Sequence, residues 1–463
     1  METSPGTSLE TSCAATEADS VAAQPGQASW PSEPASGRGR SHGTSSHQPF
    51  DRWFRYPAGF ASDYVGLLLD RLQVESGTVV DCFTGSGVSG TAARARGLGF
   101  AGIEAHPLIA ELARLKLTPS APGQAVRDLA ACVEDSAGRA IESAPKGWER
   151  VLAGEPDLVR RSFAEETLYA LVSLRQAVVS HADDPAAAYL KWALLATLRD
   201  VAGVKVGWPY QRPGVSRKPR HTDALKRFRA RAQTIARDLD SAATDASEAL
   251  SAQVVTGDSR DSAAWAKLSG SGTACVSSPP YLNNFDYADA TRLELYFWGE
   301  VTTWGDMCRE IRADMVTATT QQSSVREKAD ALDVLRGRVA THPAPAKEIV
   351  GLVEDITMVK KERQKRSKEY DQVAPAYFVA MWDILQNLHD FLQPGSKAVW
   401  LVGDSAPYGV YIDTPRLIGQ ISEAVGFTFT EDVHLRARGD RWRQNADRHN
   451  VKLAERLIVM EKP

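Results

Sequence analysis

The sequence predicts an α/β fold, in which helices flank a sheet. The first indication is an apolar strand at 78–81 that runs into a glycine-rich turn and then a helix. The second is an apolar run at 273–277 that stops at two consecutive prolines, which cannot continue the hydrogen bonding of a sheet. Strands that alternate with helices in this way are typical of parallel sheets.

Length and composition narrow the class of protein. The chain has 463 residues, enough for two or three domains, and its 43% hydrophobic and 24% charged residues are typical of a globular protein. The net charge of -4 does not indicate a nucleic-acid binder, so any basic surface must be local. The five cysteines include no C-x-x-C pair, so we expect neither a disulfide framework nor a metal site. No signal peptide or membrane span is recognisable, and we expect a cytoplasmic protein.

The first 46 residues are rich in Ser, Ala, Gly, Pro and Thr and contain almost no large apolar side chains. Such a segment cannot bury enough apolar surface to offset the loss of chain entropy, so we predict a disordered tail. We expect order from residue 47, where an aromatic cluster at 47–57 precedes a predicted helix at 61–72. The simplest interpretation of this cluster is a segment whose aromatic rings pack on the core.

Three glycines, at 85, 87 and 90, follow the first strand and precede a helix. Glycine lets a ligand approach the backbone closely, and a helix amino terminus adds a partial positive charge. No Gly-Lys-Ser/Thr follows, which excludes a phosphate loop for nucleoside triphosphates. The next predicted strand ends at Glu104, and an acid about 20 positions after such a loop is placed to hold a ribose. The pattern indicates a site for an adenosine-bearing cofactor or, alternatively, a plain α/β crossover.

Helices are predicted from about 118 to 250, for example at 168–179 and 189–201. Residues 205–237 contain ten Lys or Arg and one acidic residue, Asp223. Two interpretations remain open for this run. It is a solvated helix face, or it is a surface that follows a nucleic-acid backbone.

The tetrad Ser278-Pro279-Pro280-Tyr281 ends the strand at 273–277, and ligands bind at the carboxyl ends of strands in open α/β sheets. A small polar side chain, a fixed carbonyl and an aromatic plate suit a planar ring that carries an exocyclic amino group. The alternative is a strand-ending turn with a core tyrosine.

The rest of the chain continues the α/β pattern after a long interruption. We interpret 300–372 as a polar, partly mobile insertion, and Arg436–Asn450 as an exposed basic loop with five arginines. The remaining predicted elements are strands at 253–256, 398–402, 428–435 and 456–460, helices at 377–392 and 415–425, and an aromatic-rich segment at 285–298 that passes into a helix.

Two motifs in this order resemble those of the S-adenosylmethionine-dependent DNA amino-methyltransferases. Asp81-Cys-Phe-Thr-Gly-Ser-Gly is similar to the cofactor motif of the family, D-P-F-x-G-S-G, with Cys82 in place of proline. The tetrad at 278–281 matches the catalytic motif of the family, which begins with Asp, Asn or Ser. The resemblance spans roughly 47–117 and 252–460 and does not explain the insertions between them.

The resemblance implies a fold, a cofactor and sets of site residues. The fold would be a Rossmann-like, mostly parallel, seven-stranded methyltransferase sheet with helical insertions, and the cofactor S-adenosylmethionine. The implied catalytic residues are Ser278, Pro279, Pro280 and Tyr281. The implied cofactor-binding residues are Phe54, Tyr56, Pro57, Asp81, Phe83, Gly85, Ser86, Gly87, Glu104 and Asp258. From the two basic stretches we add DNA-binding candidates at Arg217, Lys218, Arg220, Arg438, Arg441 and Arg443.

The resemblance also orders the chain into parts. They are a tail at 1–46, a cofactor-binding part at 47–117, a helical insertion and candidate DNA-recognition region at 118–250, a catalytic part at 251–299, the polar insertion at 300–372, and a C-terminal part at 373–463. The cofactor motif precedes the catalytic one, which excludes the circularly permuted members of the family.

The tetrad chemistry agrees with the resemblance. An aromatic amino nitrogen is a poor nucleophile because its lone pair is delocalised into the ring. Hydrogen bonds to the Ser278 hydroxyl and the Pro279 carbonyl would support its developing positive charge, and Tyr281 would stack on the base. A base within a duplex cannot reach such a site, so base flipping is implied. A C5-cytosine methyltransferase would need a nucleophilic cysteine here, and Cys275 lies within the strand.

The expected activity is methylation of double-stranded DNA, with restriction or defence-system proteins as partners. Ser278 at the first position of the tetrad favours N4 of cytosine over N6 of adenine. One alternative is the same chemistry on RNA or on a protein glutamine. Another is a binding module that has lost catalysis, which the intact Gly85, Gly87 and Ser278 argue against.

Overall fold

The structure is a computed structural model. It describes residues 30–31, 47–56, 61–143, 148–205, 212–218, 221–244, 251–283, 286–320, 325–363, 368–438 and 451–463. The chain divides into two units, Met1–Trp30 and Pro31–Pro463, and the elements below belong to the second. Nearly all of the tail for which we predicted disorder, 1–46, lies outside the described residues.

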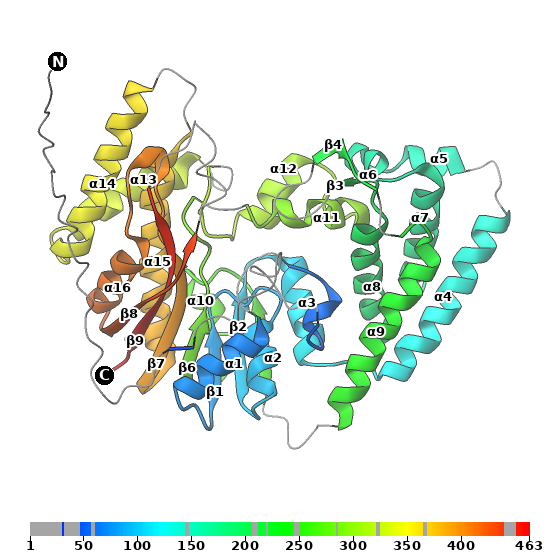
Figure 1. Ribbon diagram of the computed structural model, residues 1–463, viewed down its shortest axis with the longest axis horizontal. Helices are drawn as coiled ribbons and strands as arrows, with labels where there is room; N and C mark the ends of the chain where they lie inside the picture. Colours follow the sequence, from blue (N-terminus) through cyan, green and yellow to red (C-terminus); the bar gives the residue numbers. More distant parts are fainter. Residues whose placement is uncertain are drawn as a thin grey trace, which may run out of the picture. The chain divides into compact units, whose positions relative to one another are not determined.

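A seven-stranded sheet forms the centre of the fold, in the order β5-β2-β1-β6-β7-β9-β8 (Figure 1). The first five strands are mutually parallel, whereas β9 runs antiparallel to both β7 and β8. The strands are β1 Thr78–Asp81, β2 Gly99–Glu104, β5 Ala252–Thr256, β6 Gly272–Ser277, β7 Leu392–Gly403, β8 Thr428–Arg438 and β9 Leu453–Glu461. The predicted Rossmann-like, mostly parallel, seven-stranded sheet is confirmed.

The strand order places a ligand crevice at a definite point. From β1 the chain continues outward to β2 and β5, and it then returns to add β6 on the other side of β1. Ligands of open α/β sheets bind outside the carboxyl ends of the strands where the order reverses in this way. Here that point lies between β1 and β6, which are the two strands that precede the glycine turn and the Ser278 tetrad.

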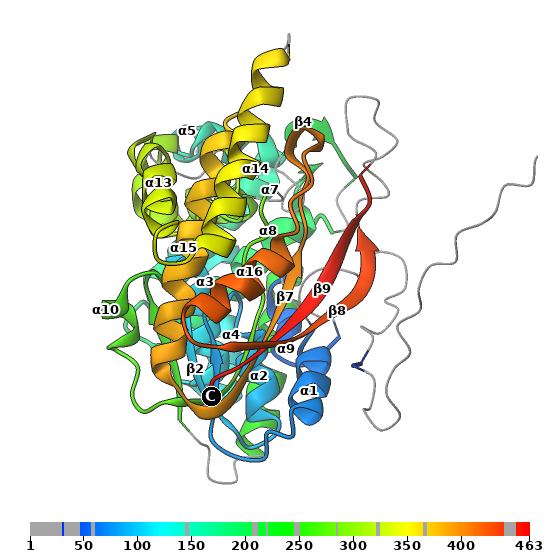
Figure 2. The same ribbon diagram turned by 90° about the vertical axis from the view of Figure 1, so that its left-hand side faces the viewer.

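Helices cover both faces of the sheet. α15 and α16 pack on a core that includes Val80 and Ile103, while α1 and α2 lie on the other side (Figure 2). Burial on both faces explains why β1, β2 and β6 are almost continuously apolar. The bounds are α1 Ser62–Arg71, α2 Val88–Arg94, α3 Pro107–Leu117, α10 Ser262–Trp265, α15 Tyr370–Phe391 and α16 Thr414–Ala424.

The helices predicted between 118 and 250 are present. Four of them, α4, α7, α8 and α9, run side by side (Figure 1). The region comprises α4 Gly123–Ser143, α5 Trp148–Ala153, α6 Asp157–Ser162, α7 Glu165–Val179, α8 Pro185–Val201, α9 Ala224–Thr244 and a small hairpin of β3 Val204–Lys205 and β4 Arg212–Ser216.

The aromatic cluster before α1 packs on this helical region. Trp53 meets Tyr189 edge-on at 5.8 Å between ring centroids. The Asp238 carboxylate of α9 accepts hydrogen bonds from the Phe50 backbone N–H (2.9 Å) and the Trp53 indole N–H (2.8 Å), and it also pairs with Arg52. These contacts bear out the interpretation of 47–57 as a core-packing segment for its described part, 47–56.

In the stretch expected to be a polar insertion, 300–372, the helices α13 and α14 pack on α15, whereas Met307 and Ile311 of η3 belong to the core of the helical region. The buried apolar residues Leu335, Ile349, Val353 and Ile356 of α13 and α14 belong to the same core as the sheet. They occur at helical spacing among many charged residues, so the stretch looks polar on average while one face of each helix is apolar. The elements are α12 Trp304–Asp306, the π-helical turn η3 Met307–Arg312, α13 Val325–Arg338 and α14 Pro343–Glu362.

The short elements that remain connect these parts. They are η1 Asp51–Trp53, η2 Asp289–Thr291, α11 Arg292–Trp298 and η4 Pro407–Gly409. The aromatic-rich segment after the tetrad becomes η2 and α11, and Leu293, Leu295 and Phe297 are buried in the core of the helical region. Within the described part of the chain, no helix combines the length and the apolar character that crossing a membrane requires.

Candidate active site

The glycine turn after β1 is fixed by hydrogen bonds from three directions. The Asp81 carboxylate accepts from the Phe83 backbone N–H (3.0 Å) and from the Ser277 hydroxyl on β6 (2.6 Å). The buried Lys116 ammonium of α3 donates to the Ser86 carbonyl at 2.8 Å. Burial raises the pKa of Asp81 to about 6, although the hydrogen bonds from Ser277 and Phe83 oppose the rise. The turn is therefore a rigid part of the sheet edge.

Two glycines of the turn have backbone conformations that other residues rarely adopt. Gly85 has φ +51° and Gly87 φ +82°, both left-handed. A Cβ on Gly87 would also lie 3.1 Å from the Ala113 Cβ of α3. The sequence signal of closely spaced glycines thus has a direct conformational cause.

Glu104, at the end of β2, links the turn to the next strand. Its two carboxylate oxygens accept from the Gly85 backbone N–H (2.7 Å) and from the His106 backbone N–H (2.9 Å). Burial raises the pKa of Glu104 to about 7, with the two hydrogen bonds opposing the rise. A buried carboxylate with a perturbed pKa beside a cavity is typical of a functional site.

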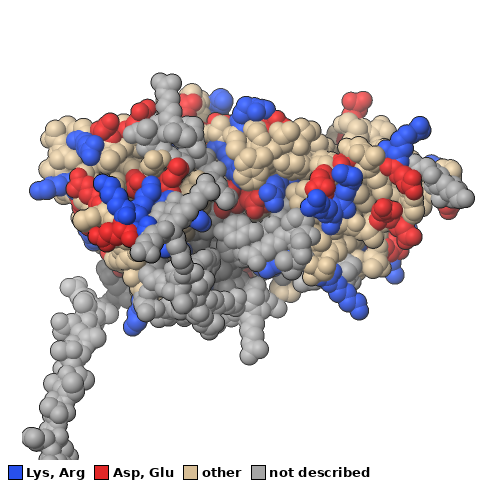
Figure 3. Space-filling view, turned by 90° about the horizontal axis from the view of Figure 1, so that it is seen from above, with Lys and Arg blue, Asp and Glu red and all other residues tan. Residues whose placement is uncertain are grey.

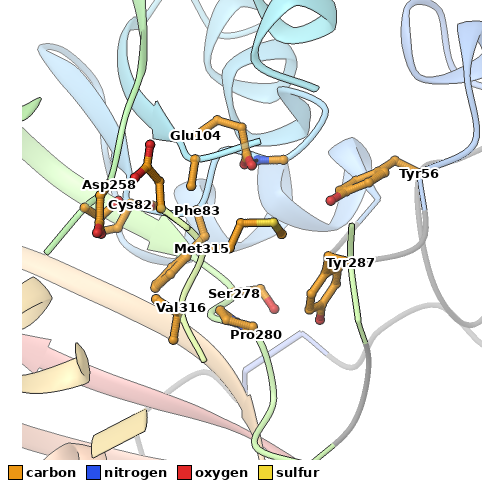
Figure 4. A pocket seen from close by; sticks show the side chains of 14 residues that line it. Tyr56, Cys82, Phe83, Glu104, Asp258, Ser278, Pro280, Tyr287, Met315 and Val316 are labelled. Carbon is orange, nitrogen blue, oxygen red and sulfur yellow. Dashed lines mark hydrogen bonds between the residues drawn. The ribbon is translucent and has the colours of Figure 1, made fainter. Parts of the chain in front are cut away.

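A cavity of about 600 Å³, including its open part, lies at the reversal point of the strand order. In Figure 4, Asp258 and Cys82 lie at one end, Tyr56 and Tyr287 at the other, and Met315 between them. The lining residues are Tyr56, Cys82, Phe83, Gly85, Glu104, Ala105, Asp258, Ser259, Ser278, Pro280, Tyr287, Asp314, Met315 and Val316. The glycine turn and the tetrad, 190 residues apart in sequence, thus open onto one cavity.

The first residue of the tetrad presents its oxygen to this cavity. The Ser278 hydroxyl donates to the Leu401 carbonyl of β7 at 3.3 Å. A hydroxyl has one hydrogen and two lone pairs, so a hydroxyl that donates in this direction retains acceptor capacity. Ser278 is therefore oriented as an acceptor.

Tyr281 does not line the cavity. It is 8% exposed, and the Arg438 guanidinium carbon lies 5.0 Å from its ring centroid. Burial is the main cause of a pKa well above the usual value for Tyr281. The proposed stacking plate is thus covered by a side chain of β8 in this structure.

The predicted cofactor residues divide into three groups. Tyr56, Phe83, Gly85, Glu104 and Asp258 line the cavity, and the Asp258 carboxylate also pairs with Arg260 at 2.6 Å. Asp81, Ser86 and Gly87 belong to the turn but do not line the cavity. Phe54 packs edge-on against Trp192, with 5.1 Å between the ring centroids. Pro57 lies outside the described residues.

Sequence reasoning missed part of the cavity wall. Tyr287 belongs to the aromatic-rich segment after the tetrad, but nothing singled it out there. Asp314, Met315 and Val316 come from the stretch that looked like an insertion. An ion pair between Arg312 and Asp286 (2.5 Å), with both side chains at most 2% exposed, holds that stretch against the tetrad segment. No local sequence signal reports such a long-range pair.

Three arginines of the described basic run on α9 pair with carboxylates of neighbouring helices. Arg227 and Arg231 both pair with Asp200, at 2.6 and 2.8 Å, and Arg229 pairs with Glu134. On the face seen in Figure 3, positive and negative side chains are interspersed. These pairs favour the interpretation of a structural and solvated helix over a continuous phosphate-binding face.

The remaining DNA-binding candidates are only partly described. Arg217 donates to the Arg199 carbonyl at 3.0 Å, and Lys218 is exposed. Arg438 lies against Tyr281, whereas Arg220, Arg441 and Arg443 lie outside the described residues. Among the described residues, no cluster of three or more His, Cys, Asp or Glu side chains is arranged to hold a metal ion.

No protein-family profile matches the chain, and no curated protein matches it. Among solved structures, two of the rRNA methyltransferase AviRa from Streptomyces viridochromogenes, at 1.5 and 2.4 Å resolution, are similar to this chain. The first is 10% identical with a TM-score of 0.25, covering 86% of this chain and 83% of that chain. The second is 12% identical with a TM-score of 0.25, covering 87% and 86%. The assignment of the fold rests on the strand order of this chain.

Proposed function

We propose that the protein transfers a methyl group from S-adenosylmethionine to N4 of a cytosine flipped out of duplex DNA. The observation that carries the proposal is that the Ser278 tetrad and the Gly85 turn face one cavity at the reversal point of the sheet. Each motif alone is a weak signal. Their convergence is what a donor pocket beside an acceptor pocket requires.

The cavity residues fit the donor. Glu104 has a buried carboxylate with lone pairs beyond its two backbone contacts, which suits ribose hydroxyls. Asp258 and Phe83 offer an acceptor and a ring face for an adenine, and Tyr56 faces the opposite end of the cavity.

The chain contributes orientation and charge stabilisation to the reaction. When bound, S-adenosylmethionine supplies an electrophilic methyl group. The Ser278 oxygen, whose hydrogen points to the Leu401 carbonyl, accepts from the amino group of the base, and so does the Pro279 carbonyl. These acceptors stabilise the positive charge that develops on the nitrogen, and the surplus proton is released to water after transfer.

Support for a DNA target comes from the resemblance of the two motifs, because on the face seen in Figure 3 positive and negative side chains are interspersed and Arg227 and Arg231 pair with Asp200. The aromatic helix α11 is part of the protein core. The choice of substrate is therefore a question for direct measurement.

The test is methyl transfer to competing substrates. The purified protein is incubated with methyl-labelled S-adenosylmethionine and unmethylated genomic DNA, total RNA or protein extract, and products are digested and identified by mass spectrometry. We expect N4-methylcytosine in DNA and none with Ser278→Ala. Label confined to RNA or protein would overturn the DNA target, and N6-methyladenine alone would overturn the choice of base. Sequencing the modified DNA then gives the recognition site.

A further inference from the structure

Arg438 lies against the ring of Tyr281, the tyrosine of the tetrad. It ends β8, and its guanidinium carbon lies 5.0 Å from the Tyr281 ring centroid. A Cβ on Gly403 would lie 2.0 Å from Arg438 Nη1 and 2.8 Å from Tyr281 Cδ2. The missing side chain of Gly403, at the end of β7, therefore makes the space in which arginine and tyrosine meet.

The neighbouring carboxylates are occupied by other donors. Glu455 pairs with Arg436 at 2.5 Å. Asp404 accepts from the Ala454 backbone N–H at 2.8 Å and from the Tyr411 hydroxyl at 3.1 Å. Among the described residues Arg438 has no ion pair, and its Nη1 is buried without a hydrogen-bond partner. A guanidinium that is partly desolvated and lacks an acceptor is costly, and a ligand with acceptors would relieve that cost.

The pairing edge of cytosine presents one donor and two acceptors, the N4 amino group followed by N3 and O2. Ser278 and Pro279 take the amino group as acceptors under the proposed function. The Ser278 hydrogen is directed to the Leu401 carbonyl, so this hydroxyl does not serve N3. N3 and O2 then need donors from another residue. They lie side by side on a planar edge, an arrangement that the two-pronged guanidinium matches.

We infer that Arg438 is the residue that recognises the target base, by donating to N3 and O2 of a cytosine stacked on Tyr281. The inference rests on the proposed function and extends it to the choice of base. Adenine has one acceptor, N1, beside its amino group and a carbon-bound hydrogen where cytosine has O2. Arg438 thereby favours cytosine, and in the free protein it covers the ring that the base will occupy.

The test uses a duplex that carries the recognition site found by sequencing, with either cytosine or 2-thiocytosine as the target base. Sulfur is a weak acceptor, so the substitution weakens the contact to position 2 alone. We expect wild-type kcat/KM to fall about 10-fold on 2-thiocytosine, and Arg438→Met to lower kcat/KM on cytosine by about 10- to 100-fold. Arg438→Met should show no further loss on 2-thiocytosine, because the interacting donor is gone.

Three controls separate recognition from folding. Affinity for S-adenosylmethionine and the melting temperature should stay unchanged in Arg438→Met. Arg416→Met removes the same charge from α16, where Arg416 pairs with Glu348, and should keep wild-type kinetics. Gly403→Ala retains the arginine but crowds both Arg438 and Tyr281, and should lower kcat/KM on cytosine at least as much as Arg438→Met.

The outcomes distinguish this inference from the proposed function. If wild type forms N4-methylcytosine while Arg438→Met matches it on both bases, the inference is overturned and the function stands. If Arg438→Met is slower but still loses another 10-fold on 2-thiocytosine, Arg438 does not contact that edge. Absence of methyl transfer to DNA by wild type, or transfer to adenine alone, overturns both.

Discussion

Replacing Glu104 by Gln tests the buried carboxyl beside the cavity in the ligand-free protein. Glu104 is 8% exposed, and both its oxygens accept backbone N–H groups. The Gln amide is neutral like a protonated carboxyl, but its nitrogen cannot accept the second backbone N–H, so the variant loses one hydrogen bond at every pH. The variant therefore keeps the neutral form at every pH. It isolates the free energy of ionising Glu104 inside the fold.

The magnitude follows from the pKa. Burial raises the pKa of Glu104 from 4.5 to about 7, so the folded state holds its proton more tightly than the unfolded state. The associated stability is fully present below pH 4.5 and is lost as the pH rises through about 7. The gap between the two pKa values corresponds to about 3 kcal/mol. The lost hydrogen bond gives a constant offset, so we expect the difference in unfolding free energy between Glu104→Gln and wild type to shift by about 3 kcal/mol in favour of the variant between pH 4.5 and pH 8.5.

The assay is urea unfolding of both proteins at intervals from about pH 4.5 to 8.5, with the difference in unfolding free energy plotted against pH. The titration of Asp81, which has a pKa of about 6, is shared by both proteins and largely cancels in the difference. Asp70→Asn is the control, because Asp70 pairs with Arg96 on the surface and its pKa is lowered. Parallel curves for wild type and Glu104→Gln would refute the reasoning.

Three further predictions concern single residues. Glu104→Ala should weaken binding of S-adenosylmethionine by about 10-fold or more in calorimetric titration, and unchanged affinity would remove Glu104 from the donor pocket. Tyr281→Ala should bind the donor normally but lose about 10-fold or more in turnover on duplex DNA, and full turnover would contradict base stacking. Arg312→Met leaves Asp286 buried without its partner and should destabilise the fold by about 3–5 kcal/mol in urea unfolding. A wild-type midpoint for that variant would mean that the pair contributes nothing.

Local patterns in the sequence were sufficient to predict the parallel strands of the core and the positions of both motifs. The strand before Asp81, the left-handed Gly85 and Gly87, and the acid at Glu104 all follow from short-range rules, and the structure has them as expected. The two prolines after Ser277 likewise end β6 at the expected residue. Each of these features is decided by residues within one turn or strand.

Features that depend on distant residues could not be read in the same way. Phe54 was expected at the cofactor, but its ring packs on Trp192, because a buried aromatic ring and a ligand-contacting one look alike in sequence. Met315 lines the cavity because the ion pair between Arg312 and Asp286 holds its segment there, and sequence patterns do not show such a pair. Arg438 of β8 contacts Tyr281 of the tetrad, although the two residues are more than 150 positions apart. No sequence pattern near either residue predicts this contact.

The anchoring of the aromatic segment by Asp238 has a consequence for synthesis of the chain. Phe50 emerges from the ribosome 188 residues before the carboxylate that its backbone N–H donates to. At the usual rate of about 5–20 residues per second, that delay is roughly 10–40 s. Throughout this interval the indole N–H of Trp53 lacks its acceptor, Asp238. The position of Tyr56, which lies three residues later and lines the cavity, is therefore not yet fixed. The aromatic segment can therefore take its place only after α9 has been made, and the cavity that Tyr56 lines is complete later still, once Val316 has been made.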